Sequence, residues 1–336
     1  MPSMIFPCAC SGIRTATSPR RSRLWRGKRP PRWLAAVLFL LFLFPVLRAG
    51  ETPAAPVEVT DDTGHTLRLE RPARRIIPLY GAFGEMLLAL GCGDRIVART
   101  DADARIPQLS SLPAVGTHMR PNAELVAAQR PDLVLQMSGR GEAALQTEAL
   151  RRLGVPVLNF EVTSFAQLFG VMERLGRLCG REAQAKALVA DWRGRLDALR
   201  AATANQRPWR MFYEARYPNL LAAGNGGIVA DIMAAAGGEN VVRQGRKLAR
   251  INEEALILAD PDVYLVQRGP MNPAPQPLAE RPHYRGLRAV REGRTLVVDE
   301  ALFARPGPRS IEAAELLAAW LKGLQRPESG ARGEQK

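Results

Sequence analysis

The chain has 336 residues, of which 46% are hydrophobic, and a formal net charge of +14 at pH 7. Residues 1–50 hold nine of the 47 Lys and Arg and no acid, so the other residues carry 38 basic and 33 acidic side chains, a net +5. That balance is ordinary for a protein surface and gives no argument for nucleic-acid binding. The length allows two domains after a targeting segment is removed.

Residues 1–50 have the pattern of a secretory signal peptide. A basic run leads into the apolar stretch Trp33–Leu47 and then into a Pro- and Ala-rich exit. The apolar stretch is shorter than the roughly 20 residues that cross a bilayer, although an uncleaved membrane anchor remains the alternative. We expect cleavage between Ala49 and Ala55. Because no cysteine follows the apolar stretch closely, we expect a periplasmic protein without a lipid anchor.

Four cysteines divide between the signal peptide and the mature chain. Cys8 and Cys10 leave with the signal, and Cys92 and Cys179 remain. Two cysteines permit one disulfide, but nothing in the sequence brings them together. The preferred interpretation is two buried or free thiols. No cysteine spacing is typical of a metal site.

The mature chain begins with a predicted β-hairpin over residues 57–69, turning at Asp62-Thr-Gly64. Apolar strands and helices then alternate up to residue 163, with one helix carrying Glu85 in its first turn. This alternation indicates an α/β lobe, residues 57–163, with a parallel sheet covered on both faces. The predicted strands lie at residues 75–79, 96–98, 133–136 and 155–160.

Residues 164–203 are predicted to be linking helices. Ser164 caps a helix that runs through Leu178, and a second helix runs from Arg181 to about Ala202. A helix of about 20 residues is about 30 Å long, enough to brace two lobes. A second α/β lobe follows over residues 208–325, and the polar tail 326–336 is predicted to be disordered. Strands are expected at 211–214, 263–266 and 295–298, with a helix at Asp231 and a final helix at 309–324.

An internal repeat supports a duplicated lobe. Arg120-Pro-Asn-Ala-Glu124, with Pro131-Asp132 after it, recurs as Arg250-Ile-Asn-Glu-Glu254 with Pro261-Asp262, at a constant offset of 130 residues. In each copy the Asn is expected to cap a short helix, and Pro-Asp is expected to turn into an apolar strand. Upstream, Gly84–Gly91 pairs with Ala230–Gly237, an acid-led helix of small residues that ends on Gly.

The order of these elements resembles the helical-backbone (class III) periplasmic substrate-binding proteins of ABC importers for iron–siderophores, cobalamin and haem. The resemblance implies two Rossmann-like α/β lobes with parallel central sheets, joined by one long helix, with the ligand in a cleft between the lobes. The matching segments are Asp61-Asp-Thr-Gly64, Arg75-Ile-Ile-Pro78, Glu85-Met-Leu87, Gly91, Val115-Gly116, Asn122-Ala-Glu124, Arg130-Pro-Asp-Leu-Val134, Leu175-Gly176, Gly180-Arg-Glu182, Ala236-Gly-Gly-Glu-Asn-Val241 and Ala259-Asp-Pro-Asp262.

In such a fold the ligand is expected at the carboxyl ends of the parallel strands. Rings and guanidinium groups from the loops there suit a bulky anionic chelate. We expect an iron–siderophore-type chelate as ligand, with a corrinoid or haem as alternatives and no resident cofactor. His118, Met119 or Tyr80 could also ligate haem iron. The expected ligand-binding residues are Tyr80, Phe83, His118, Met119, Arg140, Tyr213, Arg216, Tyr217, Arg268, Phe303 and Arg305.

The resemblance also implies an exposed acid on each lobe that docks onto Arg residues of the membrane permease. Glu85 matches the first acid. The internal repeat pairs it with Asp231, although many relatives carry Glu one turn later, where this chain has Ala234. The expected partners are therefore the chelate and an inner-membrane permease and ATPase complex, with the binding protein itself a monomer and no nucleic acid bound.

An enzyme and a membrane-tethered sensor are the competing classes. Gly224-Asn-Gly-Gly227 precedes a helix but lacks the Lys and Ser/Thr of a phosphate-binding loop. The chain has only three histidines and no Gly-x-Ser-x-Gly elbow, which leaves little for triad chemistry or for a bare metal ion. The sequence therefore favours an exported binding protein.

Overall fold

The computed structural model describes residues 56–138 and 142–324. The predicted signal peptide, its cleavage region, Arg140 and the tail 326–336 lie outside the described residues. The hairpin is confirmed, because β1 (Val57–Thr60) pairs antiparallel with β2 (Thr66–Leu69). Asp61 closes its turn by accepting from Thr63 N at 2.8 Å and His65 N at 2.9 Å.

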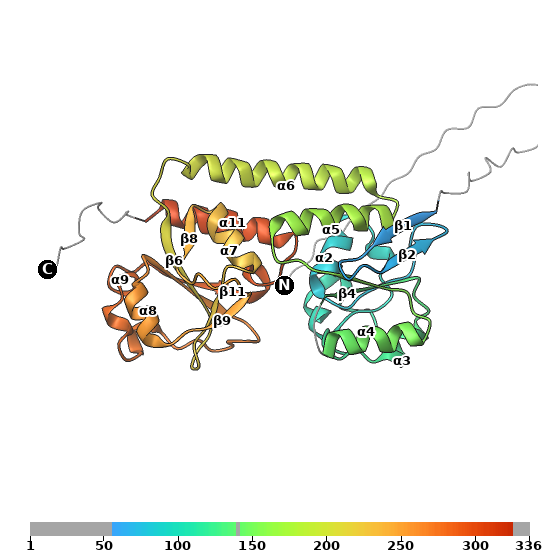
Figure 1. The fold of residues 1–336 in the computed structure, drawn as a ribbon, viewed down its shortest axis with the longest axis horizontal. Coiled ribbons are helices and arrows are strands. Elements are labelled where there is room, and N and C mark those ends of the chain that lie inside the picture. The colour runs from blue at the N-terminus through green and yellow to red at the C-terminus, as the bar shows by residue number, and fades with distance from the viewer. Residues whose placement is uncertain (1–55, 139–141, 325–336) are drawn as a thin grey trace, which may run out of the picture. The chain divides into compact units, whose positions relative to one another are not determined.

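The first main sheet is parallel, as predicted, in the order β3-β4-β5. Its strand β4 (Leu133–Met137) is labelled in Figure 1, above α4 (Glu142–Arg152) in that view. The apolar residues of β3 and β5 are all buried, which fits a sheet covered on both faces. The strand predicted at residues 96–98 is not formed, since Ile96 makes only an isolated bridge to Ile76. The elements are β3 (Ile76–Pro78), α2 (Gly81–Ala89), α3 (Ala123–Ala128), β4 (Leu133–Met137), α4 (Glu142–Arg152) and β5 (Val157–Phe160), with short 3-10 turns at Gly93–Arg95, Asp101–Arg105 and Pro107–Leu109.

Two helices follow where linking helices were predicted. The Ser164 side chain caps α5 (Phe165–Leu178) by accepting from Gln167 N at 3.2 Å. Gly180, with φ at +61°, then turns the chain into α6 (Glu182–Thr203), because this left-handed conformation favours glycine. α6 packs against α5, and it also packs against α7 (Ile228–Ala235) and α11 (Arg309–Lys322).

The second main sheet has six strands in the described residues, in the order β11-β10-β6-β7-β9, with β8 pairing on β6. The strands β11, β10, β6 and β8 are mutually parallel, but β7 pairs antiparallel with both β6 and β9, which corrects the expectation of a wholly parallel sheet. The elements are β6 (Trp209–Arg216), β7 (Leu221–Ala223), α7 (Ile228–Ala235), β8 (Gly238–Asn240), β9 (Leu248–Arg250), α8 (Glu253–Ala259), β10 (Val263–Arg268), 3-10 turns at Leu278–Glu280 and Tyr284–Gly286, α9 (Arg288–Arg291), β11 (Thr295–Asp299), α10 (Glu300–Phe303) and α11 (Arg309–Lys322).

The internal repeat folds into equivalent local structures. Asn122 caps α3 and Asn252 caps α8, each accepting at 3.0 Å from the backbone N–H three residues later. Asp132 then accepts from the backbone N–H of Arg75 at 2.9 Å, and Asp262 accepts from that of Arg210 at 3.1 Å. Asp132 therefore ties the start of β4 to the start of β3, and Asp262 ties the start of β10 to the start of β6.

Two arginines complete this equivalence, although they lie outside the repeated motif. The side chains of Arg75 and Arg210 both donate to the carbonyl groups at the end of the capped helix, where Arg130 and Asp260 have positive φ. The acceptors are Gln129 O and Arg130 O for Arg75, and Ala259 O and Asp260 O for Arg210. The guanidinium group contacts the same kind of helix-end carbonyl groups at both sites, as expected for a duplicated α/β unit.

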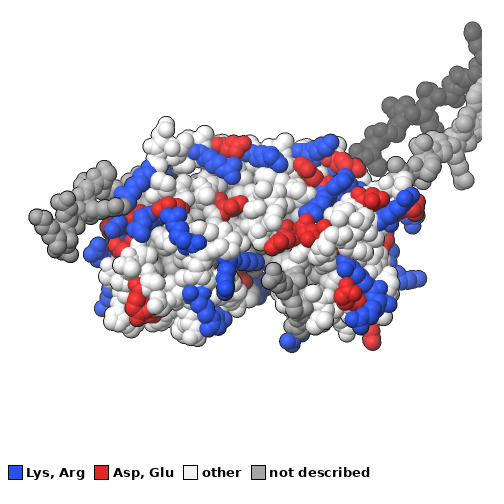
Figure 2. Space-filling view, in the orientation of Figure 1, with Lys and Arg blue, Asp and Glu red and all other residues white. Residues whose placement is uncertain are grey.

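The largest hydrophobic cluster continues from the first sheet through α5 and α6 to the second sheet. Val189, Trp192 and Leu196 supply the buried face of α6. Within residues 56–138 and 142–324, no helix has the length and apolar character that a membrane crossing requires. On the face drawn in Figure 2, basic and acidic side chains are interspersed, in keeping with the small net charge outside residues 1–50.

Candidate functional site

Several predicted ligand residues lie where parallel strands end. Tyr80 follows β3 and occupies the N-cap position of α2, while Arg216 and Arg268 are the last residues of β6 and β10. The Tyr80 ring centroid lies 5.7 Å from the His118 ring, in an edge-on arrangement. The His118 carbonyl accepts from Gln136 Nε2, on β4, at 3.2 Å, which holds the histidine beside the strand end.

Asp103 joins this group, although sequence reasoning missed it. The side chain is fully buried, and Oδ2 accepts from Thr100 Oγ1 at 2.6 Å. Oδ1 has no hydrogen-bond partner among the described residues. Both Asp103 Oδ1 and Arg305 Nη1 approach the backbone of Gly81 so closely that any larger residue there would overlap them. Glycine at the start of α2 therefore makes room for a carboxylate and a guanidinium.

Arg305 connects this group to the C-terminal part of the chain. Its Nη1 lies 3.3 Å from Glu85 Oε1, and the two side chains are 21% and 11% exposed. The prediction of Glu85 as an exposed acid is wrong in this respect, because α2 turns the carboxylate inward to a guanidinium. The second oxygen, Glu85 Oε2, is buried and has no partner in the described part of the chain.

The environment leaves Tyr80 and His118 neutral at pH 7. Burial raises the pKa of Tyr80 to about 12, with Arg305 opposing the shift and nearby carboxylates adding to it. Burial also lowers the pKa of His118 below its usual 6.5, with Lys247 and Arg305 adding to the shift and Asp103 opposing it. The site therefore presents a phenol donor and an uncharged imidazole.

Lys247 and Glu300 bring opposite charges from the second α/β unit, and sequence reasoning missed both. Lys247 as a whole is exposed, but protein around its ammonium group desolvates it and lowers its pKa, while Glu300 opposes this shift. Glu300 follows β11 directly and accepts from Gln267 Nε2 and Met271 N, each at 2.9 Å. Its place after a parallel strand was a usable signal; nothing in the sequence around Lys247 distinguished it.

Tyr217 rests on a buried ion pair. The Arg281 guanidinium carbon lies 4.1 Å from the Tyr217 ring centroid. The side chains of Arg281 and Glu214 are both fully buried and form two hydrogen bonds, of 2.5 and 2.9 Å. Tyr264 Oη donates to the same carboxylate at 2.6 Å. The bonds to Glu214 hold the Arg281 guanidinium group in place, and the Tyr217 ring packs against that group.

Three of the predicted aromatic ligand residues belong to the core instead. Phe83, Tyr213 and Phe303 are between 1% and 3% exposed. Phe83 packs edge-on against Phe160, and Tyr213 donates to Gln267 Oε1 at 2.9 Å. Their rings therefore support the neighbouring loops, and a ligand has no surface of theirs to touch in this structure.

The remaining predicted residues have mixed positions. Met119 is 38% exposed, Arg268 is exposed and Tyr217 is half-buried. Arg216 is half-buried, and its Nε is buried without a hydrogen-bond partner among the described residues. Arg140 lies outside those residues. The structure thus brings together Tyr80, His118 and Arg305, and it adds Asp103 and Lys247.

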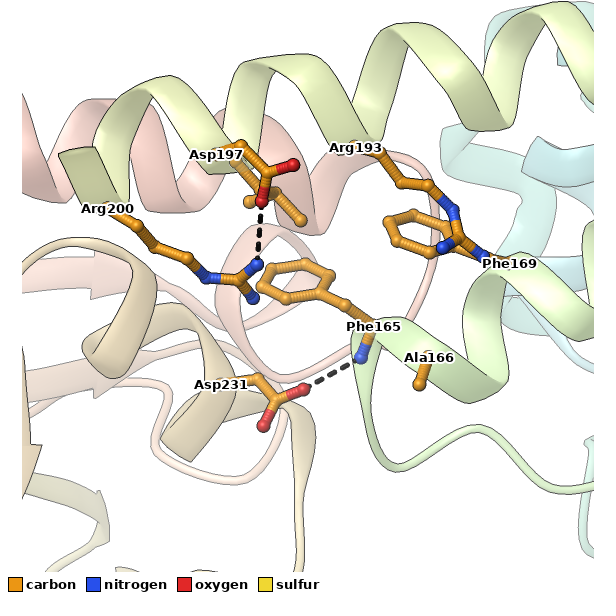
Figure 3. Close-up of a pocket in the computed structure, with 8 residues that line it drawn as sticks. Phe165, Ala166, Phe169, Arg193, Asp197, Arg200 and Asp231 are labelled. Carbon is orange, nitrogen blue, oxygen red and sulfur yellow. Dashed lines mark hydrogen bonds and ion pairs between the residues drawn. The ribbon is translucent and has the colours of Figure 1, made fainter.

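Asp231 lies elsewhere, on a pocket between α5, α6 and α7 (Figure 3). Its Oδ2 accepts from Phe165 N, at the first turn of α5, at 2.8 Å. Asp231 therefore serves the α5 N-terminus rather than standing free as an exposed acid, whereas Ala234 is exposed. The pocket has a volume of about 270 Å³. Its lining residues are Phe165, Ala166, Phe169, Arg193, Leu196, Asp197, Arg200 and Asp231.

The sequence matches one protein family over most of the described residues. The model of the family described as periplasmic binding protein matches residues 76–302. The chain belongs to the periplasmic binding protein family. It is accordingly a transport component and not an enzyme. No group of three or more His, Cys, Asp or Glu that could hold a metal ion occurs in the part of the chain that the structure describes.

Individual relatives are distant but cover most of both chains. The uncharacterized ABC transporter substrate-binding lipoprotein YvrC of Bacillus subtilis is 26% identical over 277 residues, 80% of this chain and 86% of that protein. The vitamin B12-binding protein of Vibrio cholerae is 25% identical over 261 residues, 76% of this chain and 91% of that protein.

Solved structures show the same fold. The Fe3+-hydroxamate transport protein of Saccharomonospora viridis has a TM-score of 0.64 and 25% identity, covering 80% of this chain and 100% of its own. A periplasmic heme binding protein from Pseudomonas aeruginosa has a TM-score of 0.64 and 26% identity, covering 76% of this chain and 95% of its own.

Proposed function

We propose that this periplasmic binding protein captures an iron–siderophore-type chelate and delivers it to an ABC importer in the inner membrane. In this proposal residues 57–163 and 208–325 are two lobes, residues 164–203 join them, and the chelate binds in a cleft between them. Residues 1–50 direct export and are removed, and the protein acts as an unlipidated monomer in the periplasm. The named relatives that bind vitamin B12, transport Fe3+-hydroxamate or bind heme support this class of ligand.

One observation carries the proposal: both α/β units contribute to a single group of side chains. Tyr80 and His118 come from the first unit, and Lys247 and Arg305 come from the second. Cations beside a phenol and an imidazole suit the carboxylate, hydroxamate or catecholate oxygens and the apolar body of a chelate. Arg216 Nε, buried without a partner among the described residues, is a further donor for an anionic group.

A corrinoid or haem is the second candidate, and His118 is the observation that favours it. An imidazole held neutral at pH 7 is a metal ligand, whereas the Tyr80 phenol, with its pKa raised to about 12, is a poor one. Iron coordination by His118 would change the visible spectrum of bound haem, and binding of a ferric chelate would leave the histidine uncoordinated.

Titration of the mature protein tests the proposal. We expect tryptophan fluorescence to saturate at one ligand per chain with a ferric hydroxamate or catecholate, and the ligand to be recovered unchanged. Lys247→Ala should weaken binding, and Lys322→Ala, which removes an exposed lysine at the end of α11, should not. Saturation only by haemin or cobalamin would select the second candidate. Failure of every chelate, or chemical conversion of the ligand, would contradict the binding function.

Permease docking by Glu85 and Asp231 stays a prediction. The family resemblance supports it, but both acids are engaged within the chain, Glu85 by Arg305 and Asp231 by Phe165 N. Docking through either acid would require that this internal contact be exchanged for an Arg of the permease. Parallel measurements of ligand affinity and uptake on variants of each acid separate the two roles.

A further inference from the structure

Two buried cysteines lie side by side at the ends of two helices. Cys92 follows Gly91, where α2 has ended, and Cys179 is the C-cap residue of α5. They are 0% and 1% exposed, and each thiol is close enough to shift the pKa of the other. Both thiols are free and buried, as expected, and the fold brings together helix ends that are far apart in the sequence.

Arg95 holds the two cysteine segments in register. Its backbone N–H donates to Cys92 O at 3.1 Å, and its Nη1 donates to Cys179 O at 2.8 Å. The same Nη1 donates to Ala73 O at 3.0 Å, which ties a third segment to the pair. Arg95 thus bonds to the carbonyl groups of both cysteines, which holds the two cysteine segments next to one another.

The surroundings also favour one thiolate. The neighbouring Cys179 thiol lowers the pKa of Cys92, and the nearby guanidinium groups of Arg95 and Arg181 add to this effect. The neighbouring Cys92 group, and then burial, raise the pKa of Cys179. A thiolate is the nucleophile in thiol–disulfide exchange, so Cys92 is the cysteine that reacts first.

We propose that Cys92 and Cys179 form a disulfide bond that joins the end of α2 to the end of α5. Its formation inside cells depends on the proposed export, since the periplasm is oxidising and the cytosol is not. A disulfide donor, either an oxidised dithiol protein or glutathione disulfide, supplies the oxidising equivalents. The Cys92 thiolate attacks one donor sulfur, which forms a mixed disulfide and releases one donor thiolate. Cys179 then loses its proton and attacks the Cys92 sulfur, releasing the second donor thiolate.

The bond can be tested on the purified mature protein without any variant. The protein is equilibrated in glutathione disulfide, denatured, treated with a maleimide and analysed by mass spectrometry with and without prior reduction. We expect no maleimide before reduction, two after it, and one non-reduced peptide pair containing both cysteines. Free thiols, a persistent glutathione adduct or a disulfide between two chains would each overturn the proposal.

Matched variants and a cellular sample extend this test. Cys92→Ala and Cys179→Ala should each retain one cysteine that ends as a thiol or as a glutathione adduct. The glutathione experiment uses purified protein, so its result does not depend on where the protein is located in the cell. It therefore tests the disulfide proposal separately from the proposed export. Protein isolated from the periplasm with thiols blocked at lysis should already carry the bond. Protein that oxidises in glutathione yet emerges reduced from cells would place the error in the proposed export, and the disulfide proposal for the folded chain would stand.

Discussion

Arg305 and Glu85 form an ion pair 3.3 Å long, although 220 positions separate them in the sequence. The pair brings the segment before α11 to the start of α2, next to Tyr80 and Asp103. A largely buried pair is costly to break from one side only, because the remaining charge keeps its desolvation cost without its partner.

Replacement of Glu85 by Ala is expected to change ligand affinity. Without Glu85 the Arg305 guanidinium loses its carboxylate partner beside Tyr80, so its position in the site should no longer be fixed. We expect a change of roughly tenfold in the ligand dissociation constant, the scale of a lost hydrogen bond to a charged group. Isothermal titration with the bound chelate measures it, and Glu124→Ala, an exposed acid on α3, is the control. Unchanged affinity with reduced uptake would instead support the docking role.

The affinity for an anionic chelate should rise in acid because of His118. The folded protein holds the pKa of His118 below 6.5, so the free imidazole gains a proton only at lower pH. A bound anion offsets the repulsion from Lys247 and Arg305 and favours the protonated imidazole, so protonation and binding strengthen one another. We expect constant affinity from about pH 8 down to about pH 6.5, followed by a rise. His118→Ala should flatten the rise, and a rise of equal size in that variant would assign it to another group.

Asp61 should stabilise the fold in a pH-dependent way. Burial raises the pKa of this carboxyl, but hydrogen bonds from Thr63, Asn159 and His65 outweigh it, and the net pKa lies below 3.8. A lowered pKa gives stability that is present above pH 3.8 and is lost as the pH falls through the folded-state value. Asp61→Asn should therefore cost about 2 kcal/mol at pH 7 and less near pH 3.

Urea denaturation at the two pH values measures the Asp61 effect. Glu58→Gln, on the exposed edge of the same hairpin, serves as the control and should change the free energy of unfolding little. An Asp61→Asn cost that is equal at both pH values would show that the hydrogen bonds do not depend on the ionised carboxylate.

Asp231→Ala should lower stability through α5. The substitution leaves the Phe165 N–H at the first turn of that helix without its acceptor. We expect a loss of about 1 kcal/mol, as for the removal of an N-terminal cap. Asp197 lines the same pocket, but its carboxylate forms only an exposed ion pair with Arg200. Asp197→Ala should therefore lower the free energy of unfolding by about a few tenths of a kcal/mol at most. Thermal unfolding compares the two, and equal losses would contradict the capping role.

Much of the fold could be predicted because its signals are local. Asn caps, Pro-Asp turns and continuous apolar strands are each read within a few residues, and the constant offset between Asn122 and Asn252 revealed the duplication. The strands β7 and β9 were missed because each has three residues, too few for an alternation to appear. Ile96 has strand-like neighbours but makes only one bridge, since no partner strand continues beside it.

The candidate site was less predictable, because side-chain direction depends on the packed structure. Phe83 and Tyr80 lie one helical turn apart, yet Phe83 packs on Phe160 in the core. An aromatic residue type suits both environments, so sequence alone does not separate them. Asp103 was missed because its role depends on its approach to Gly81, a contact between distant segments that no motif marks.

The Asp231–Phe165 hydrogen bond also bears on how the chain would fold during the proposed export. A polypeptide threaded through a translocon emerges from its N-terminus, so in such an export α5 would enter the periplasm before residue 231. Until α7 arrives, the first turn of α5 lacks the carboxylate that accepts from Phe165 N. The last stage of ordering at the start of α5 must therefore follow the release of α7. Partial translocation products that stop before Ile228 should accordingly be more open to proteases around residue 165 than the complete chain.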